Sequence, residues 1–390
     1  MPPEKTELLT RIEKFSERLA QGGYEAALLR YPLNIFYFTG AFVDGHLVIT
    51  SQKRAFLLVY RTRARLFEDS PVEAQVFRSL KKLPQFLKEL GIKKLGLEAD
   101  RLSAALFWRY QKLLADFELG DVSPFLRELR AVKSPYEISC LKQAAEVLAK
   151  ALWAFLPQLR PGMTELEAAG LLEKELRRLG HPAFTRTSGF GQELAYGHLL
   201  SGEAATVPSY LTTGQGGAGV YGFPQGPSFK KIKENEPILI DYAGWFEGYM
   251  VDQSRLFCLG EIPKKALRIF EKILALMEAL EELLFPGTLA RKIYEEAQKF
   301  AAKEGLEPCF MAHGPEKVPF VGHGVGLEID EWPPIAQVEI PLKEGMVIAL
   351  EPKCHVPGLG VIGLEDTFLV TDKGPRRLTT FPRGFQKLIF

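Results

Sequence analysis

The chain has 390 residues, of which 46% are hydrophobic and 25% are charged, and its formal net charge is +1. This length is too great for one small core and favours two domains, and the composition is that of an ordinary globular protein. The balanced charge argues against nucleic acid as a partner, because nucleic-acid-binding proteins carry a basic excess.

The four cysteines are widely separated and form no CxxC pair. This spacing argues against a disulfide framework or a zinc ribbon and favours a reducing compartment. The first 20 residues are charged and contain no apolar signal-peptide core, and no uncharged apolar run reaches the roughly 18 residues of a membrane span. We therefore expect a cytoplasmic protein without a membrane partner.

The first part of the chain alternates strands and helices. Residues 31–40, YPLNIFYFTG, are interpreted as turn-rich. The expected helices are 5–22 and 103–117, and the expected strands are 24–30, 46–50, 54–60 and 93–99. Alternation of this kind is typical of an α/β domain, which we place at residues 1–133.

The pattern changes at Lys133-Ser134-Pro135. Ser134 is a suitable N-cap for a long helix whose first turn includes Pro135 and Glu137. A second domain is therefore expected over residues 134–390, and the chain as a whole is of the α/β (α+β) class.

Two segments of this second domain resemble each other. LRPGMTELEAAGLLEKELRRLG has its Pro-Gly pair at Pro161 and ends at Gly180, whereas LFPGTLARKIYEEAQKFAAKEG has its pair at Pro286 and ends at Gly305. Both landmarks are 125 residues apart. The repeat predicts a duplicated half-domain with pseudo-twofold symmetry and an active site between the halves. The alternative is a coincidence between two common amphipathic helices.

The stretch LIDYAGWFEGYMVDQSR contains Asp241 and Asp252 in an apolar setting, where a lone carboxylate is costly. Their midpoint falls between Phe246 and Glu247. A hairpin with a two-residue loop at this point would place the two carboxylates directly opposite each other. Two like charges in that arrangement repel unless a cation lies between them.

The stretch IALEPKCHVPGLGVIGLEDTFLV carries Glu351 and Glu365, whose midpoint is Gly358 in the turn-like PGLG. A hairpin centred there again sets two acids face to face. Between the two stretches, His323 stands between glycines in FVGHGVGL, where the backbone can approach a bound group closely.

Four carboxylates and one imidazole are suitable ligands for two divalent cations, because bridging carboxylates hold such ions about 3.5–4 Å apart. Oxygen-rich ligation with one histidine suits Mn²⁺ or Co²⁺ best, and Fe²⁺ or Zn²⁺ is also compatible. Each acid alone is more simply a surface or capping residue. Five ligands in this order, with both hairpin centres on turn residues, favour the metal interpretation.

These segments resemble the creatinase/aminopeptidase P/prolidase group, peptidase family M24. The resemblance covers nearly the whole chain and rests on LIDYAGWFEGYMVDQSRLF, GHGVGL, LEP and LEDTFLVT. It implies a creatinase-like N-terminal domain, a pita-bread catalytic domain and a homodimer. It maps the metal ligands onto Asp241, Asp252, His323, Glu351 and Glu365. It also implies that Glu351 is the general base acting on a metal-bridging water.

The chain departs from the family near the substrate. Related peptidases usually carry two histidines and an arginine where this chain has Ser209, Asp330 and Gly363. The candidate substitutes are His198 for catalysis and Arg186, Asp330 and His313 for substrate binding. The alternatives are a structural histidine at 198 and a surface salt bridge at 186.

Arg255, which follows Asp252 closely, matches an arginine common in the family. We expect it either to hold a ligand carboxylate or to form a plain ion pair.

The first functional hypothesis is a dinuclear Xaa-Pro aminopeptidase or Xaa-Pro dipeptidase that cleaves short proline-containing peptides. The second is a non-peptide enzyme on the same fold, either a creatinase-like C–N hydrolase or a metal-assisted lyase, because a fold does not determine a function. The third is a binding protein without catalysis, which would be expected to have lost metal ligands. All five are present, so the first hypothesis is favoured.

Overall fold

The structure is a computed structural model that describes residues 3–60 and 70–389. The chain divides into two compact units between Arg130 and Ala131, three residues before the expected boundary at 133/134. The first unit contains α1 (Lys5–Gln21), β1 (Ala26–Leu29), α2 (Pro32–Thr39), β2 (Gly45–Thr50), β3 (Ala55–Val59), β4 (Glu73–Val76), α3 (Leu83–Glu89), β5 (Lys94–Leu97), α4 (Ala104–Leu113), β6 (Glu118–Asp121) and most of α5 (Ser123–Ala131).

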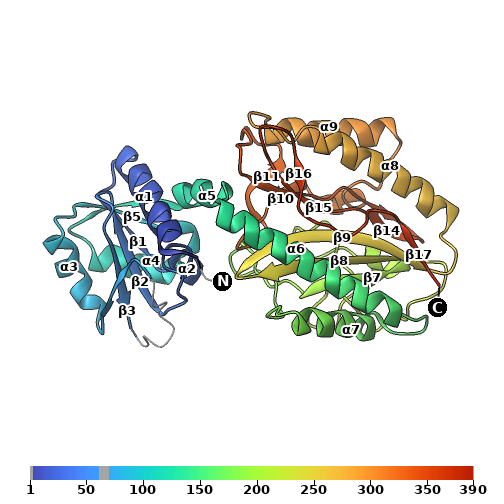
Figure 1. Ribbon diagram of the computed structural model, residues 1–390, viewed down its shortest axis with the longest axis horizontal. Helices are drawn as coiled ribbons and strands as arrows, with labels where there is room; N and C mark the ends of the chain where they lie inside the picture. Colours follow the sequence, from blue (N-terminus) through green and yellow to red (C-terminus); the bar gives the residue numbers. More distant parts are fainter. Residues whose placement is uncertain (1–2, 61–69, 390) are drawn as a thin grey trace. The chain divides into compact units, whose positions relative to one another are not determined.

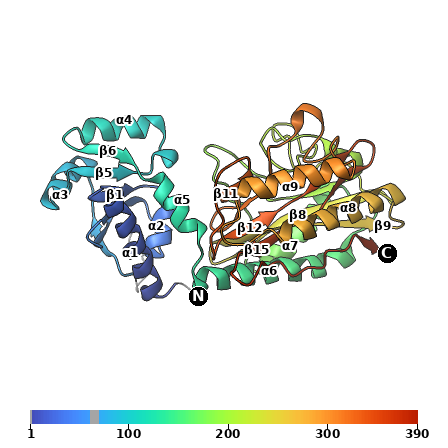
Figure 2. The same ribbon diagram turned by 90° about the horizontal axis from the view of Figure 1, so that it is seen from above.

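A six-stranded mixed sheet forms the centre of the first unit, with the strand order β4-β3-β2-β1-β5-β6. Figure 1 shows α1 and α2 on one side of this sheet and α3 on the other, and in Figure 2 α1 and α4 lie on opposite sides of β1 and β5. Leu83, Leu87 and Tyr110 from α3 and α4 pack with buried strand residues into one core. This arrangement confirms the expected α/β domain.

Residues 31–40, which were expected to be turn-rich, contain helix α2, so that expectation is wrong. Pro32 lies in the first turn of the helix, where its missing N–H removes no intrahelical bond. Gly40 ends the helix with a φ of 71°. Ile35 and Phe38 are fully buried, so burial of the apolar face outweighs the modest helix propensity of the segment.

His46 in β2 is buried between two tyrosine hydroxyls. Its Nδ1 lies 2.9 Å from the hydroxyl oxygen of Tyr60, and its Nε2 bonds to the hydroxyl of Tyr110. Burial lowers the pKa of His46 to about 3, and the charge of Arg30 acts in the same direction. An unfolded histidine titrates near 6.5, so the unfolded state binds the proton more tightly. The contribution of His46 to the free energy of unfolding is therefore fully present above about pH 6.5 and is lost as the pH falls towards 3.

We expect acidification from pH 7 to pH 5 to lower the opening free energy of β2 by about 2 kcal/mol through His46, at about 1.4 kcal/mol per pH unit below 6.5. The His46→Gln variant keeps a hydrogen-bonding side chain and should lose this part of the pH dependence. Hydrogen exchange of β2 peptides, corrected for the intrinsic rate at each pH, measures both proteins. Equal pH slopes would contradict the prediction.

The second unit begins with the long helix expected after Ser134, whose side chain accepts the N–H of Glu137 in a capping box. Its elements are α6 (Pro135–Phe155), α7 (Glu165–Arg178), β7 (Gly197–Ser201), β8 (Pro237–Phe246), β9 (Tyr249–Leu259), α8 (Lys264–Glu281), α9 (Ala290–Lys303), β10 (Phe320–Gly324), β11 (Glu331–Ala336), β12 (Val347–Leu350), β13 (Lys353–Val356), β14 (Gly360–Gly363), β15 (Asp366–Leu369), β16 (Arg376–Arg377) and β17 (Gln386–Leu388).

The predicted repeat is confirmed. Helices α7 and α9 each have 14 residues, and both their first and their last residues are 125 positions apart. The turns before them are held alike: the N–H of Gly162 donates to the carbonyl of Ile232, and the N–H of Gly287 donates to the carbonyl of Leu342, both at 2.8 Å. The second unit therefore consists of two similar halves.

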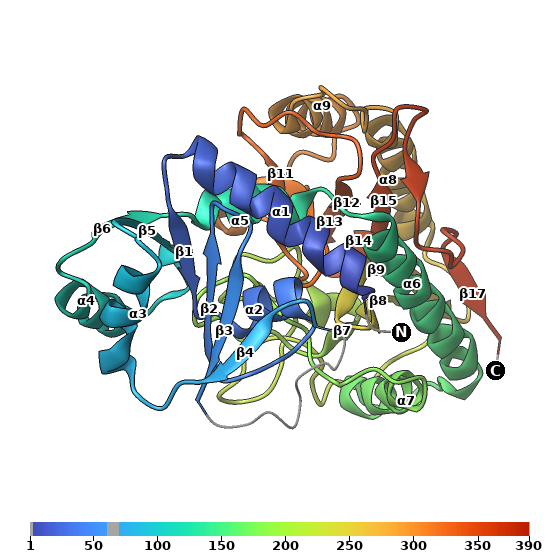
Figure 3. The same ribbon diagram turned by 60° about the vertical axis from the view of Figure 1, so that its left-hand side comes forward.

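Each half has its own sheet and its own pair of helices. The first sheet has the order β17-β9-β8-β7, and the second has the order β11-β10-β12-β15-β16, with β13 and β14 forming a separate pair. Apolar residues of α6 and α7 pack on the first sheet, and those of α8 and α9 pack mainly on the second. In Figure 3 the four helices form an arc, from α9 at the top through α8 and α6 to α7 at the bottom.

No helix within residues 3–60 and 70–389 combines the length and the apolar character needed to cross a bilayer.

Candidate metal centre

The first predicted hairpin is formed by β8 and β9, but its turn lies one residue later than the midpoint argument placed it. Asp241 pairs with Ser254, and Asp252 pairs with Ala243, so the two aspartates are not directly opposite. Glu247 and Gly248 form the two-residue loop with φ values of 48° and 93°, and a turn with two positive φ angles favours glycine at its second position. Since the register shift is two residues, both aspartates still lie on one face of the sheet.

The second predicted hairpin has the expected register. Leu350 pairs with Asp366 on one side of the acids, and Lys353 pairs with Gly363 on the other. Both pairings are symmetrical about Gly358, which has a φ of 73°. The register therefore sets Glu351 opposite Glu365, as predicted.

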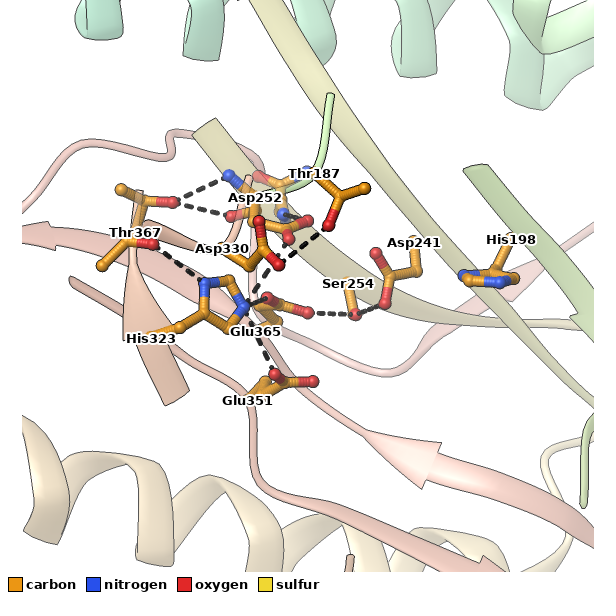
Figure 4. A network of polar contacts seen from close by, with 12 residues as sticks. Thr187, His198, Asp241, Asp252, Ser254, His323, Asp330, Glu351, Glu365 and Thr367 are labelled. Atoms are coloured by element: carbon orange, nitrogen blue, oxygen red, sulfur yellow. Dashed lines mark hydrogen bonds and ion pairs between the residues drawn. The ribbon is translucent and has the colours of Figure 1, made fainter. Parts of the chain in front are cut away.

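His323 lies on β10, next to Ala349 of β12, and its imidazole points toward the acids (Figure 4). His323 Nε2 is 3.3 Å from Glu351 Oε1, 3.9 Å from Glu365 Oε1 and 4.0 Å from Asp252 Oδ2. Ligand atoms held about 2.0–2.2 Å from one metal ion lie at such separations from each other. Glu365 Oε1 is buried and has no hydrogen-bond partner within the described part of the chain. The residues present thus fit a divalent ion at this position.

The five predicted ligands come from both halves of the second unit. Asp241 and Asp252 belong to the first half, and His323, Glu351 and Glu365 belong to the second. Ser254 links the two sets, because its hydroxyl contacts Asp241 Oδ2 at 2.6 Å and Glu365 Oε2 at 2.9 Å. The expected position between the halves is therefore confirmed for this cluster.

Lys353 is a member of the cluster that sequence reasoning missed. Its Nζ lies 2.9 Å from one oxygen each of Asp241, Glu351 and Glu365. The side chain is only 1% exposed. A local signal existed, because Lys353 follows Glu351 by two positions in an apolar stretch, and residues two apart in an extended strand share a face. Lysine is almost never fully buried unless it is paired.

The positive charge in the cluster is unevenly distributed. Burial raises the pKa of Asp252 to about 7, and the neighbouring charge of Asp241 acts in the same direction. Burial also acts to raise the pKa of Asp241, but the ammonium of Lys353 outweighs it and the pKa is lowered. In Glu351, burial is likewise outweighed by Lys353 and His323, which hold the pKa at about 2. The charges of His323 and Lys353 act to lower the pKa of Asp252 but do not outweigh its burial.

The segment before β8 passes close to the cluster. Gln215 donates its amide to Asp241 Oδ2, and the same amide nitrogen is 3.1 Å from His198 Nδ1. A Cβ atom on Gly214 would lie 2.3 Å from Glu351 Oε2, so only glycine allows this approach. Sequence reasoning missed Gln215 because nothing local connects it to Asp241.

His198 lies on β7, paired in register with Asp241, and Figure 4 shows it beside Asp241. It is 7% exposed, and burial lowers its pKa. Its Nδ1 lies 3.1 Å from the amide nitrogen of Gln215, which in turn contacts the carboxylate of Asp241. The catalytic role of His198 stays a prediction.

The three predicted substrate-binding residues lie in different surroundings. Arg186 donates to the carbonyl of Leu327 at 2.8 Å, and its guanidinium lies 4.9 Å from the ring centre of Trp245. Asp330 accepts from the hydroxyl of Thr187 at 2.8 Å and also from a backbone N–H. His313 is exposed and precedes a short 3₁₀ turn. Their roles in substrate binding stay predictions, and Asp330 already anchors a neighbouring loop.

A polar cavity of about 280 Å³ lies beside the cluster. Its walls are residues 208–213, 215–216, 312 and 315–319, together with His355. Ser209 and Gln215 line it, and Gln215 also contacts Asp241. His355 Nε2 bonds to the carbonyl of Gly214 at 2.8 Å. The cavity therefore adjoins the residue that reaches the carboxylates.

Four buried carboxylates and a histidine, gathered between two similar halves, define a metal-dependent enzyme of the pita-bread class. Residues 139–372 match metallopeptidase family M24, and residues 11–132 match the creatinase/prolidase N-terminal domain. The chain belongs to metallopeptidase family M24, and the expected fold is confirmed. Membership in this family implies divalent metal ions and a metallopeptidase activity.

Relatives resemble the chain over nearly its whole length. A Xaa-Pro dipeptidase of Pyrococcus horikoshii is 28% identical over 96% of this chain and 97% of its own. The prolidase structure from the same organism has a TM-score of 0.81 at 27% identity and covers 96% of this chain and 99% of that one. An X-Pro aminopeptidase structure from Thermotoga maritima also has a TM-score of 0.81, at 24% identity, with 97% and 99% covered; this likeness concerns the fold alone.

Proposed function

We propose that the protein hydrolyses short peptides at Xaa-Pro bonds, as a Xaa-Pro dipeptidase or a Xaa-Pro aminopeptidase. The observation that carries this proposal is the full-length similarity to a Xaa-Pro dipeptidase, combined with the cluster of carboxylates and histidine in the same chain. The proposed substrate is a short peptide with proline after the scissile bond.

The proposed metal ligands are Asp252 Oδ2, His323 Nε2, Glu351 Oε1 and Glu365 Oε1, with Asp241 completing the buried cluster. Mn²⁺ or Co²⁺ is the proposed ion, and Zn²⁺ or Fe²⁺ also suits the ligand set. The sequence alone predicts two ions. Lys353 bears on the second position, because its Nζ lies among oxygens of Asp241, Glu351 and Glu365.

When bound, a divalent ion supplies a Lewis acid that polarises a carbonyl and acidifies water. Glu351 is the proposed general base, because a carboxylate of the cluster can accept a proton from water at the scissile carbon. His198 is proposed to assist catalysis through Gln215, because the amide of Gln215 contacts both the His198 imidazole and Asp241.

The cavity beside Gln215 is the proposed substrate pocket. At about 280 Å³ it has the size for a short peptide and not for a folded protein. Its wall residues 312 and 315–319 flank His313 in the sequence, which supports a role for this segment in substrate binding. Arg186 and Asp330 are the other proposed substrate-binding residues, and Asp330 would act by holding the loop at 187–188.

A non-peptide substrate is the second candidate. Lys353 within the carboxylate cluster is the observation that favours it, because an altered centre on a retained fold can support a different reaction. A creatinase-like C–N hydrolase and a metal-assisted lyase are the forms this alternative takes.

We expect the Mn²⁺- or Co²⁺-reconstituted chain to release proline from a Xaa-Pro dipeptide or to release the first residue from a Xaa-Pro-Xaa tripeptide. Mass spectrometry of products from a panel of both lengths measures this activity, and peptide length separates the dipeptidase from the aminopeptidase. Matched Xaa-Ala peptides serve as controls for proline preference. No cleavage of any member, with metal bound, would contradict the peptidase proposal and favour the non-peptide candidate.

We also propose a homodimer and a cytoplasmic location. The family resemblance supports the first, and the four free cysteines support the second. Sedimentation of the purified chain tests the oligomeric state.

A further inference from the structure

The four glutamate oxygens of the cluster face two separate positions. Toward His323, Glu351 and Glu365 present their Oε1 atoms, and Asp252, His323 and Glu365 have ligand atoms within 4.8 Å of one another. Toward Asp241, the same two glutamates present their Oε2 atoms, and Lys353 Nζ lies among these oxygens. Two carboxylates that each offer one oxygen to either side are the bridges of a site for two cations.

We propose that the ammonium of Lys353 permanently occupies the second of these cation positions. The centre would then hold one divalent ion, near Asp252, His323, Glu351 and Glu365, in place of the two ions that the sequence predicts. This inference rests on the proposed metal site and is independent of the proposed substrate.

The hydrogen bonds of Lys353 match an ammonium that is a fixed part of the site. An ammonium has three N–H donors and no acceptor, and the three carboxylate oxygens around Nζ all lie at 2.9 Å. Removing the group would leave three buried carboxylates without this partner, which is strongly unfavourable in a low-dielectric interior. A metal ion cannot share the position, because it would need the same three oxygens.

Gly363 provides the room for the lysine. It pairs with Lys353 across the β13–β14 hairpin, and a Cβ atom on Gly363 would lie 2.4 Å from Lys353 Cγ. Any side chain at 363 would therefore displace the lysine stem. The departure from the arginine expected at 363 thus has a physical reason in this chain.

Lys353 is a positioning residue for the remaining ion. Its ammonium contacts the Oε2 atoms of Glu351 and Glu365, each at 2.9 Å, and this leaves their Oε1 atoms facing the position beside His323.

The test is the number of metal ions per chain. The wild-type chain is stripped with a chelator, reloaded with Mn²⁺, freed of loose metal by gel filtration and analysed for metal and protein. We expect one ion per wild-type chain and two per Lys353→Met chain, because methionine keeps the apolar stem and removes the charge. The control is Lys230→Met, which removes a lysine paired with Glu236 and Ser201 outside the cluster and should bind one ion.

Electron paramagnetic resonance of the same samples gives a second readout that does not depend on activity. Wild type should show the six-line signal of isolated Mn²⁺, and Lys353→Met should show the signal of an exchange-coupled pair. Two ions or a coupled pair in wild type would overturn the inference, as would a folded Lys353→Met chain that still binds one ion. No ion in folded wild type would overturn the metal-site proposal itself. If Lys353→Met does not fold, the wild-type count and spectrum alone decide.

Discussion

The Asp252→Asn variant should lose its metal ion and at least about a thousandfold in kcat/KM on whichever substrate the wild-type chain turns over. Asp252 Oδ2 is one of the atoms grouped around the proposed ion, and it lies 4.0 Å from His323 Nε2. Asparagine replaces a negatively charged ligand with a neutral amide, which binds a divalent cation weakly. Losing Lewis-acid stabilisation of several kcal/mol costs about a factor of ten for each 1.36 kcal/mol.

Metal analysis and steady-state kinetics measure the two effects together. Asparagine has nearly the shape of aspartate, and the backbone N–H of Asp252 still reaches the hydroxyl of Thr367, so the fold should persist. The matched control is Glu173→Gln, which changes an acid near Tyr242 that is outside the cluster. We expect it to keep its metal and most of its activity. A fully active Asp252→Asn chain would remove Asp252 from the metal site.

The Asp366→Ala variant should be destabilised by about 3–5 kcal/mol, because it leaves a buried guanidinium without its ion-pair partner. Asp366 and Arg255 are both completely buried and lie 2.6 Å apart. Asp366 also accepts from Thr379 and from Arg383. Urea unfolding of the full chain, followed by the signals of the second unit, measures the loss.

An exposed pair is the control for this stability effect. Glu296→Ala removes the partner of Lys299 on the surface of α9, and exposed pairs of this kind contribute little. We expect its unfolding midpoint to match wild type. If Asp366→Ala also matched wild type, the Arg255–Asp366 pair would not stabilise the second unit.

The same pair connects stability to the metal centre. Arg255 donates to the backbone carbonyls of Ser254 and Glu365, at 2.8 and 2.6 Å, in addition to its ion pair. Of the two expectations for Arg255, the ion pair is therefore the one observed. Arg255 holds the backbone of a proposed metal ligand and not a ligand carboxylate. Loss of Asp366 should consequently also weaken metal binding.

Much of the site could be predicted because its determinants are local. Asp241 and Asp252 stand out as acids in apolar strands, and the turn residues around Gly248 and Gly358 place the two hairpins. Strand alternation then determines which side chains share a face. The repeated Pro-Gly turns and helices are likewise local, which is why the two halves could be recognised from spacing alone.

Contacts that depend on distant packing could not be predicted in the same way. Gln215 reaches Asp241 from a segment 26 residues earlier, and Asp330 holds a loop 143 residues away through Thr187. Helix α2 forms because its apolar side chains are buried by the rest of the first unit, although its sequence is typical of turns. The register of β8 and β9 depended on Gly248, because it adopts the second positive φ angle of the turn and so places the turn one residue later than the midpoint of Asp241 and Asp252.

The sequence by itself therefore determined the fold class, the two similar halves and the five residues that meet in the buried cluster. The tertiary structure alone decided what else enters that space. An isolated lysine in a strand is expected to extend its ammonium to water, and only the packing of both halves around Lys353 shows that its charge is instead buried among three carboxylates. The position of this ammonium, which no local pattern encodes, is the tertiary feature on which the proposed one-ion centre depends.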